Sequence, residues 1–211
     1  MDIEYWNNYY KKDIASHQPS SFSKFCMENY FLRNMCLVEL GSGNCRDAEF
    51  FNKNLTKIYA LDQSHEANIS ENIRLEQEDI KSMILIESDF TSDRFDFEDI
   101  VDVFYSRFTM HSITESQQNQ LLVNVFQKLK INGLFCIEAR TINDPMFGEG
   151  TNVGVNEFFT DHYRRFLDLE EFVNICKEIG FNIIYSNESN DLSVVGDDNP
   201  VLMRVVMKKE V

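Results

Sequence analysis

The stretch Val38-Glu39-Leu40-Gly41-Ser42-Gly43-Asn44-Cys45-Arg46-Asp47 decides the fold predicted for this chain. A short β-like run over residues 35–40 ends at Gly41, and a helical pattern begins at Asp47. The glycines at positions 41 and 43 allow a tight turn and a close approach of a ligand to the backbone. In open α/β sheets, ligands bind at the carboxyl ends of the strands, so this turn is the first place to expect one.

On both sides of this turn, short apolar runs alternate with helical patterns. Predicted strands cover residues 35–40, 57–61, 73–75, 100–105, 134–139, 181–185 and 201–207, and the clearest predicted helices cover 47–52, 116–129 and 168–179. Alternating strands and helices predict a mostly parallel sheet that is covered on both faces. The last two strands have no helical pattern between them, which favours an antiparallel pair.

Asp62 ends the second apolar run, 19 positions after Gly43. A carboxylate at this place can accept two hydrogen bonds from a ribose diol. Two glycines alone fit a plain turn without a ligand almost equally well, and Asp62 is what favours a nucleoside cofactor. A dinucleotide fingerprint needs a third glycine at position 46, where the chain has Arg46, whose bulk would crowd a pyrophosphate.

Together, Glu39, Gly41, Gly43 and Asp62 resemble the cofactor motifs of class I S-adenosylmethionine-dependent methyltransferases. The whole chain resembles small bacterial methyltransferases that are found with surface and capsular saccharide biosynthesis genes. Cys45 stands where the family has a further glycine, a departure that weakens the match. The resemblance implies one methyltransferase domain over residues 1–211, with residues 1–30 as an N-terminal helical lid. It also implies an α/β, Rossmann-like, seven-stranded, mostly parallel sheet with an antiparallel strand near one edge and helices on both faces.

The resemblance further implies S-adenosylmethionine as the cofactor and S-adenosylhomocysteine as its product. In the family, an acidic residue after the third strand bonds the adenine amino group, and the next backbone N–H bonds a ring nitrogen. Asp79 and Ile80 match this position, with Glu78 as the competing assignment and a solvated acidic loop as the other interpretation. The expected cofactor-binding residues are Trp6, Ser20, Glu39, Gly41, Gly43, Asp62, Gln63, Asp79, Ile80 and Ser106.

In the family, residues in the segment after the fourth strand face both the methyl group of the cofactor and the acceptor. Here that segment covers residues 105–115. His111 is the best candidate for a base because its reference pKa lies near neutrality, and His162 is the second candidate. A histidine that only bonds backbone at a helix start is an equally good interpretation of His111. Arginine forks bind phosphate or carboxylate bidentately, so several arginines near the strand ends predict an acceptor with negative charge. The alternative is that they pair with some of the 35 acidic side chains.

The expected catalytic residues are His111, Arg107 and Arg140, and the expected substrate-binding residues are Tyr163, Arg164 and Arg165. Residues 141–156 form a polar, glycine-rich stretch, which is typical of a lid loop.

The amino-acid composition limits which substrates, metal sites and cellular location are expected. The net charge of −15 would repel a phosphate backbone, which disfavours a nucleic-acid substrate. Five cysteines, an odd number without C-x-x-C spacing, suggest neither a disulfide framework nor a zinc site. We find no apolar run of the length of a membrane span and no signal peptide, and expect a cytoplasmic protein, as a monomer or homodimer.

The sequence thus predicts a methyltransferase acting on a small polar, anionic acceptor. A sugar, or a nucleotide-linked, phosphoryl or phosphoramidate group of capsule biosynthesis, would fit. Three alternatives stay open: a nicotinamide-dependent oxidoreductase, a non-catalytic binding module, and a methyltransferase that detoxifies an oxyanion such as tellurite.

Overall fold

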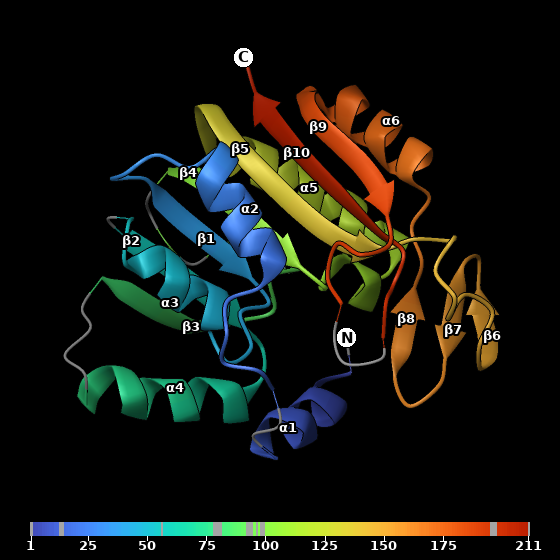
Figure 1. Ribbon diagram of the computed structural model, residues 1–211, viewed down its shortest axis with the longest axis horizontal. Coiled ribbons are helices and arrows are strands. Elements are labelled where there is room, and N and C mark those ends of the chain that lie inside the picture. The colour runs from blue at the N-terminus through green and yellow to red at the C-terminus, as the bar shows by residue number, and fades with distance from the viewer. Residues whose placement is uncertain are drawn as a thin grey trace.

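A computed structural model describes residues 2–12, 15–55, 57–77, 82–91, 95, 97, 100–194 and 198–210, without the side chains of residues 74, 76 and 77. Over these residues, the strands form a seven-stranded sheet in the order β3-β2-β1-β4-β5-β10-β9 and a small sheet in the order β6-β7-β8 (Figure 1). The predicted Rossmann-like sheet is confirmed.

The large sheet consists of β1 (Cys36–Leu40), β2 (Lys57–Asp62), β3 (Met83–Glu87), β4 (Val101–Arg107), β5 (Leu129–Arg140), β9 (Phe181–Ser189) and β10 (Leu202–Lys209). The small sheet consists of β6 (Thr151–Gly154), β7 (Glu157–Phe159) and β8 (Tyr163–Arg165). The helices are α1 (Ile3–Lys11), α2 (Ser21–Asn29), α3 (Arg46–Asn52), α4 (His65–Gln77), α5 (Glu115–Lys128) and α6 (Leu169–Ile179), with a 3-10 turn, η1 (Met110–Ser112).

The direction of the strands locates the functional edge. The pairs β1–β2, β1–β4, β2–β3 and β4–β5 are parallel, and β10 runs antiparallel between β5 and β9. Strand order therefore reverses between β1 and β4, and ligands of open α/β sheets bind at such a switch point.

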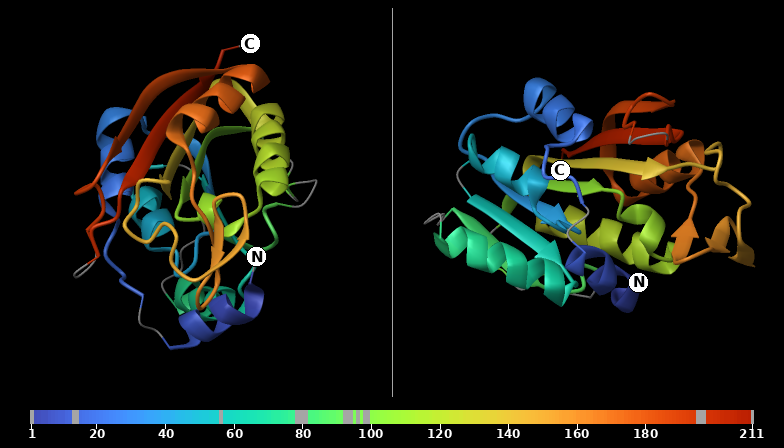
Figure 2. Two further views of the ribbon diagram at one scale, coloured as in Figure 1. Left: turned by 90° about the vertical axis from the view of Figure 1, so that its right-hand side faces the viewer. Right: turned by 60° about the horizontal axis from the view of Figure 1, so that its bottom comes forward.

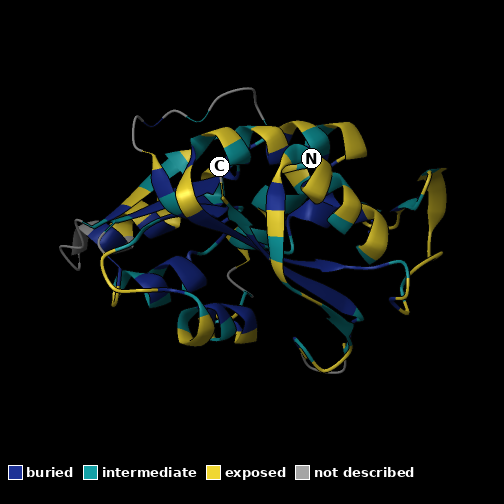
Figure 3. Cartoon of the chain, turned by 90° about the horizontal axis from the view of Figure 1, so that it is seen from above, coloured by how far each residue is buried: buried dark blue, intermediate teal, exposed yellow. Residues whose placement is uncertain are grey.

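Each face of the sheet has its own apolar core. On one face, α2 and α3 contribute Phe22, Cys26 and Phe51. On the other, α5 and α6 contribute Leu121 and Phe172. The helices are buried on the side toward the sheet and exposed on the outer side, so the strands between them are largely buried (Figures 2 and 3). This explains why the parallel strands read as apolar runs in the sequence.

One predicted element is wrong. Residues 73–75, expected as the third strand, lie in the last part of α4, where Leu75 is buried and Ile73 is exposed. The third strand is β3, ten positions later along the chain. The i, i+2 spacing of Ile73 and Leu75 is that of a strand, but in α4 the two side chains point to different sides, and only Leu75 joins the core where α4 contacts β2 and β3.

The expected lid loop over residues 141–156 is partly a strand. Thr151–Gly154 forms β6, the first strand of the small sheet, which follows the end of β5 and contacts η1 through β8 (Figure 1). No helix in the described part of the chain has the length and apolar character of a membrane span.

Candidate functional site

The turn after β1 is held by backbone hydrogen bonds to the neighbouring strand. The N–H groups of Gly41 and Ser42 both donate to the carbonyl of Leu61, at 2.8 and 2.9 Å. Both glycines have left-handed backbones, with φ of +70° at Gly41 and +53° at Gly43. A Cβ at Gly41 would lie 2.1 Å from Thr109 Cγ2, and one at Gly43 would lie 2.1 Å from the Tyr10 hydroxyl. The turn therefore needs glycine at both positions.

A cavity of about 400 Å³ opens beside this turn, at the carboxyl ends of β1, β2 and β4. This volume lies within the range of sites for small molecules and cofactors. Its walls come from Trp6, Tyr9, Tyr10, Ala15, Ser16, Glu39, Gly41, Ser42, Asn44, Arg46, Asp47, Asp62, Gln63, Phe90, Arg107, Phe108, Thr109 and Ser112. Six of the residues expected at the site are on its wall: Trp6, Glu39, Gly41, Asp62, Gln63 and Arg107.

The carboxylate of Asp62 connects the turn after β1 with the end of β2. Its Oδ2 accepts from the N–H of Gly43 and its Oδ1 accepts from the N–H of Ser64, both at 2.8 Å. Burial raises the pKa of this carboxyl, while the two N–H donors act in the opposite direction. An ionised carboxylate has about four acceptor positions, so each oxygen retains capacity for a ligand hydroxyl.

Three buried polar atoms of the cavity-lining residues have no hydrogen-bond partner among the described residues. They are Glu39 Oε2, Gln63 Nε2 and Ser112 Oγ. Burial, with the charge of Asp47 next, raises the pKa of Glu39 well above its ordinary value, which favours a neutral carboxyl. Unpartnered buried polar groups are rare and costly. A ligand with its own donors and acceptors fits this wall, and a polar nucleoside carries both.

Helix α1 closes the cavity from outside. Asn7 Oδ1 accepts from the Ser64 hydroxyl at 2.8 Å, so α1 is bonded to the start of α4. Trp6, Tyr9 and Tyr10 lie on the cavity wall, and burial raises the pKa of the Tyr10 phenol well above its ordinary value. The first helix is therefore part of the site.

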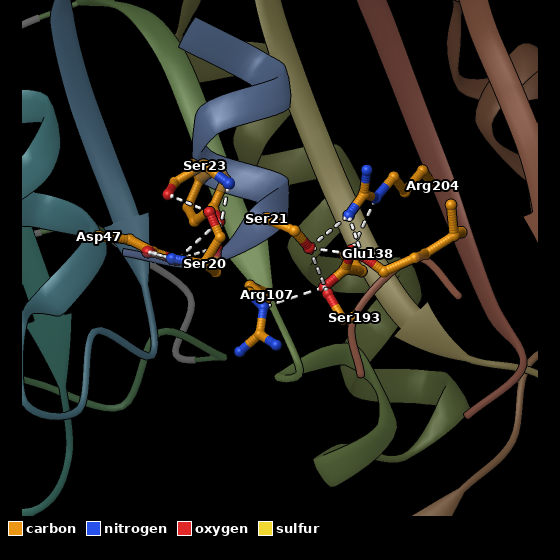
Figure 4. A network of polar contacts seen from close by, with 10 residues as sticks. Ser20, Ser21, Ser23, Asp47, Arg107, Glu138, Ser193 and Arg204 are labelled. Carbon is orange, nitrogen blue, oxygen red and sulfur yellow. Dashed lines mark hydrogen bonds and ion pairs between the residues drawn. The ribbon is translucent and has the colours of Figure 1, made fainter. Parts of the chain in front are cut away.

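Arg107 is the one expected catalytic residue on the cavity wall. Its Nε donates to Glu138 Oε1 at 2.9 Å, and its guanidinium lies 4.0 Å from the centroid of the Phe108 ring. Among the described residues, its two terminal nitrogens have no hydrogen-bond partner, and Figure 4 shows them pointing away from the network that holds Nε.

The other expected arginines are paired. Arg140 donates twice to Asp144, at 3.0 and 2.9 Å, and also pairs with Asp198. Arg164 donates to Asp161 at 3.0 Å and to Thr160. Arg165 donates to the carbonyl of Ile113 and to Gln118, at 3.1 and 2.6 Å. None of the three lines the cavity.

His111 lies in η1 and is buried, beside the ring of Phe108. Its Nδ1 has no partner within the described part of the chain. Burial lowers the pKa of His111 well below its ordinary value, and the charges of Arg140 and Arg164 lower it further. The imidazole is therefore neutral at neutral pH.

The remaining expected residues lie around the cavity. Ser20 caps α2 and bonds Asp47 through its N–H and hydroxyl, each at 2.7 Å, and Gly43 packs under Tyr10. The hydroxyl of Ser106 contacts that of Thr109, and Tyr163 begins β8. Cys45, which replaces a family glycine, has a left-handed φ of +55° and does not line the cavity, so it does not block it.

Asp79 and Ile80, the expected adenine contacts, lie outside the described residues. They depended on a third strand at 73–75, which is wrong. The same reasoning applied to β3 selects Asp89 and Phe90, and Phe90 is on the cavity wall. The apolar run Met83-Ile84-Leu85-Ile86 is the signal that would have found them. Tyr10 and Thr109 were also missed as residues of the site, because only the fold places Tyr10 against Gly43 and Thr109 against Gly41.

Residues 38–137 match a protein family described as "Methyltransferase domain". A solved SAM-dependent methyltransferase from Methanosarcina mazei has a TM-score of 0.73 at 13% identity, over 87% of this chain and 96% of that chain. One from Clostridium acetobutylicum ATCC 824 has a TM-score of 0.69 at 14% identity, over 100% of this chain and 93% of that chain.

A third similar structure is the 1,6-didemethyltoxoflavin-N1-methyltransferase of Burkholderia thailandensis, with 1,6-didemethyltoxoflavin and S-adenosylhomocysteine bound. Its TM-score is 0.70 at 14% identity, over 90% of this chain and 76% of that chain. No curated protein matches this chain. At these identities, the solved structures establish the fold.

Proposed function

On the premise that this chain carries a methyltransferase domain with the fold of S-adenosylmethionine-dependent enzymes, we propose that it transfers a methyl group from S-adenosylmethionine to a small, polar, anionic acceptor. The domain match favours this reaction over that of a nicotinamide-dependent oxidoreductase. Arg46 on the cavity wall, where a dinucleotide site would need glycine, supports the same choice.

Several residues of the cavity support S-adenosylmethionine as the cofactor. Asp62 would accept hydrogen bonds from the ribose hydroxyls, and the turn from Gly41 to Gly43 would lie against the methionine portion. Asp89 and Phe90 follow β3, where the family binds adenine. Residues 1–30 would act as a lid, since Trp6 and Tyr10 already cover the cavity. When bound, the cofactor supplies an electrophilic methyl group on a sulfonium.

The anionic acceptor rests on one observation. Arg107 presents two terminal nitrogens on the wall of the cofactor-sized cavity, with no partner among the described residues. A guanidinium edge of this kind binds a carboxylate or a phosphoryl group with two parallel hydrogen bonds. An acceptor that is already an anion needs no base, so the remaining task of the protein is to align the reactants and exclude water.

The positive neighbourhood of His111 supports this proposal. The charges of Arg107, Arg140 and Arg164 all reach its imidazole. Arg140 and Arg164 are already paired with carboxylates, so Arg107 would bind an anionic group here and the neutral imidazole would donate a hydrogen bond to it or accept one from it.

The narrowest form of the proposal is methyl transfer to a phosphoramidate or sugar of a capsular saccharide precursor. It rests on the resemblance of the sequence and on Arg107 alone. A cytoplasmic monomer or homodimer acting on a small molecule, and on no nucleic acid, belongs to the same proposal. The net charge of −15 supports the exclusion of nucleic acid.

The test is methyl transfer from radiolabelled S-adenosylmethionine. Phosphorylated and nucleotide-linked sugars form one set of acceptors, the matching neutral sugars a second set, and RNA and protein a third. Label in the first set, lost in Arg107→Met, is the expected result. Label only in RNA or protein would overturn the anionic small-molecule acceptor. Calorimetric titration with S-adenosylhomocysteine and with NAD tests the cofactor independently of any acceptor.

A further inference from the structure

Three charged residues form a row across three adjacent strands. Glu138 on β5 is the Cα partner of Arg107 on β4 and of Arg204 on β10. Because paired residues on neighbouring strands point to the same face of a sheet, the three side chains meet on one face. Figure 4 shows them converging beside the start of α2.

Glu138 is the centre of this row. Its side chain is fully buried and its oxygens accept from Arg107 Nε at 2.9 Å, Arg204 Nε at 2.7 Å and the Ser193 hydroxyl at 2.9 Å. A buried carboxylate is tolerated when it is paired and hydrogen-bonded in this way. Its two oxygens thereby fix the Nε edges of both arginines.

The two arginines then differ. One terminal nitrogen of Arg204 donates to the Ser21 hydroxyl at 2.9 Å and to the carbonyl of Leu192 at 2.8 Å, so this guanidinium is held within the protein by two of its three nitrogens. The terminal nitrogens of Arg107 have no such partner among the described residues, and Arg107 is one of the residues that line the cavity.

The charges of the row do not cancel, because two guanidinium groups share one carboxylate and leave a net positive charge. Asp47, which also lines the cavity, accepts its hydrogen bonds from Ser20 and Tyr105 instead of from Arg107. A buried charge without a partner is costly, and an anion on the outer edge of Arg107 would complete the row.

We propose that Glu138 is a positioning residue for the acceptor: it holds the Nε edge of Arg107 so that the opposite edge faces the cavity and binds the anionic group. This inference rests on the proposed function. Phe108 supports the same orientation, because Arg107 Cζ lies over its ring, 4.0 Å from the centroid. With one edge on Glu138 and one face on Phe108, the terminal nitrogens keep a single direction.

Replacing Glu138 by glutamine separates two explanations of anion binding, because net charge and positioning predict opposite changes in affinity. Glu138→Gln makes the row more positive, so if net charge alone attracts the anion, binding becomes tighter. A glutamine keeps one acceptor oxygen and replaces the other by an NH₂ group, so the two arginines no longer have an acceptor oxygen each. Any bond that Arg107 Nε still makes is to a neutral acceptor, and its fixed edge is held more weakly. Positioning therefore predicts weaker binding.

Inorganic phosphate is the probe, titrated into the full chain saturated with S-adenosylhomocysteine. Trp6 is the only tryptophan and lies on the cavity wall, so its fluorescence reports occupancy. We expect the phosphate Kd of Glu138→Gln to rise about tenfold, the effect of losing one charge-assisted hydrogen bond, with S-adenosylhomocysteine affinity unchanged. Glu138→Asp keeps the charge on a shorter stem and should recover part of the affinity.

Ser21→Ala is the matched control, because it removes a hydrogen bond from Arg204 in the same network and leaves Arg107 in place. Its phosphate Kd should equal that of the wild type, whereas Arg107→Met should abolish phosphate binding. Once an acceptor is found, Glu138→Gln should raise its KM more than it lowers kcat.

An unchanged or tighter phosphate Kd in Glu138→Gln, with Arg107→Met still inactive in binding, overturns the role of Glu138 and leaves the proposed function standing. No phosphate response in the wild type, together with no transfer to any anionic acceptor, overturns the proposed function itself. If Glu138→Gln does not fold, Glu138→Asp carries the test, and an unchanged Kd in that variant overturns the inference.

Discussion

The phenol ring of Tyr5 lies 4.1 Å from the imidazole of His162, centroid to centroid, and the Tyr5 hydroxyl donates to Asp161 at 3.1 Å. The first helix is thereby attached to the loop before β8, a segment far from α1 in the sequence. Because the next residue, Trp6, lines the cavity, this contact connects the small sheet to the cover of the proposed cofactor site.

Breaking this contact should weaken the cover. We expect Tyr5→Ala to reduce S-adenosylhomocysteine affinity by about 1 kcal/mol, the typical value of an aromatic pair beyond its buried area. Calorimetric titration measures the change. Tyr5→Phe keeps the ring and removes only the hydroxyl, so it should fall between Tyr5→Ala and the wild type. Wild-type affinity in Tyr5→Ala would show that α1 is held without His162.

Asp62→Asn tests the ribose assignment. The expected loss of S-adenosylhomocysteine affinity is about 1–3 kcal/mol, because charge-assisted hydrogen bonds become neutral ones. Asp102→Asn is the control, since Asp102 also accepts a backbone N–H, from Cys36 at 2.8 Å, at the opposite end of the sheet. Equal losses in the two variants would contradict a contact between Asp62 and the ligand.

Gly41→Ala should destabilise the fold for two separable reasons. The φ of +70° strains any side chain, and the new Cβ would lie 2.1 Å from Thr109 Cγ2. Gly148→Ala has a φ of +89° with no atom within 4 Å, so it measures the strain alone, about 1–2 kcal/mol. Urea denaturation should show a larger loss for Gly41→Ala, partly recovered in Gly41→Ala with Thr109→Ser. Equal losses at the two glycines would mean that Thr109 moves away freely.

His111→Ala should lower turnover about tenfold while S-adenosylhomocysteine affinity stays unchanged, because the variant would lose the hydrogen bond proposed between the imidazole and the acceptor. His65→Ala is the control, since His65 is exposed and bonds Glu87. Steady-state kinetics with the acceptor found by radiolabel transfer gives the comparison. Normal turnover in His111→Ala would remove His111 from the reaction and leave an anionic acceptor that needs no base.

Acid should destabilise the protein through His162. Burial, followed by the charge of Arg164, lowers the pKa of His162 from 6.5 to about 4. The unfolded chain therefore binds this proton more readily than the folded chain, so stability falls as pH decreases from about 6.5 towards 4, by about 3 kcal/mol in all. The lowered pKa of His111 acts in the same direction. His162→Gln should flatten the decrease measured by urea denaturation at pH 7, 6 and 5, and an unchanged slope would contradict it.

The sequence predicted the sheet because its strands are buried on both faces. Continuous apolar runs ending at Gly41 and Asp62 are strong local signals, and both ends lie where they were expected. The third strand was placed wrongly because a weak apolar pattern in α4 precedes the stronger one of β3. The expectation of adenine contacts at Asp79 and Ile80 depended on that third strand, whereas the same reasoning applied to β3 proposes Asp89 and Phe90.

Pairing of charges was less predictable. Arg107 and Arg140 looked alike in sequence, since each ends an apolar run. Only the fold shows that Asp144 and Asp198 form ion pairs with Arg140, while Glu138 forms an ion pair with one edge of the Arg107 guanidinium. Likewise Tyr10 meets Gly43 only after α1 has folded back over the sheet. Contacts between distant segments carry no local sequence signal.

All residues on the cavity wall lie between Trp6 and Ser112, whereas Glu138, Arg140 and the small sheet come later in the chain. Substitutions or insertions in residues 141–167 would alter what approaches His111 and Arg107 without replacing any wall residue. A lineage of such proteins could acquire new acceptors while it inherits one unchanged donor pocket.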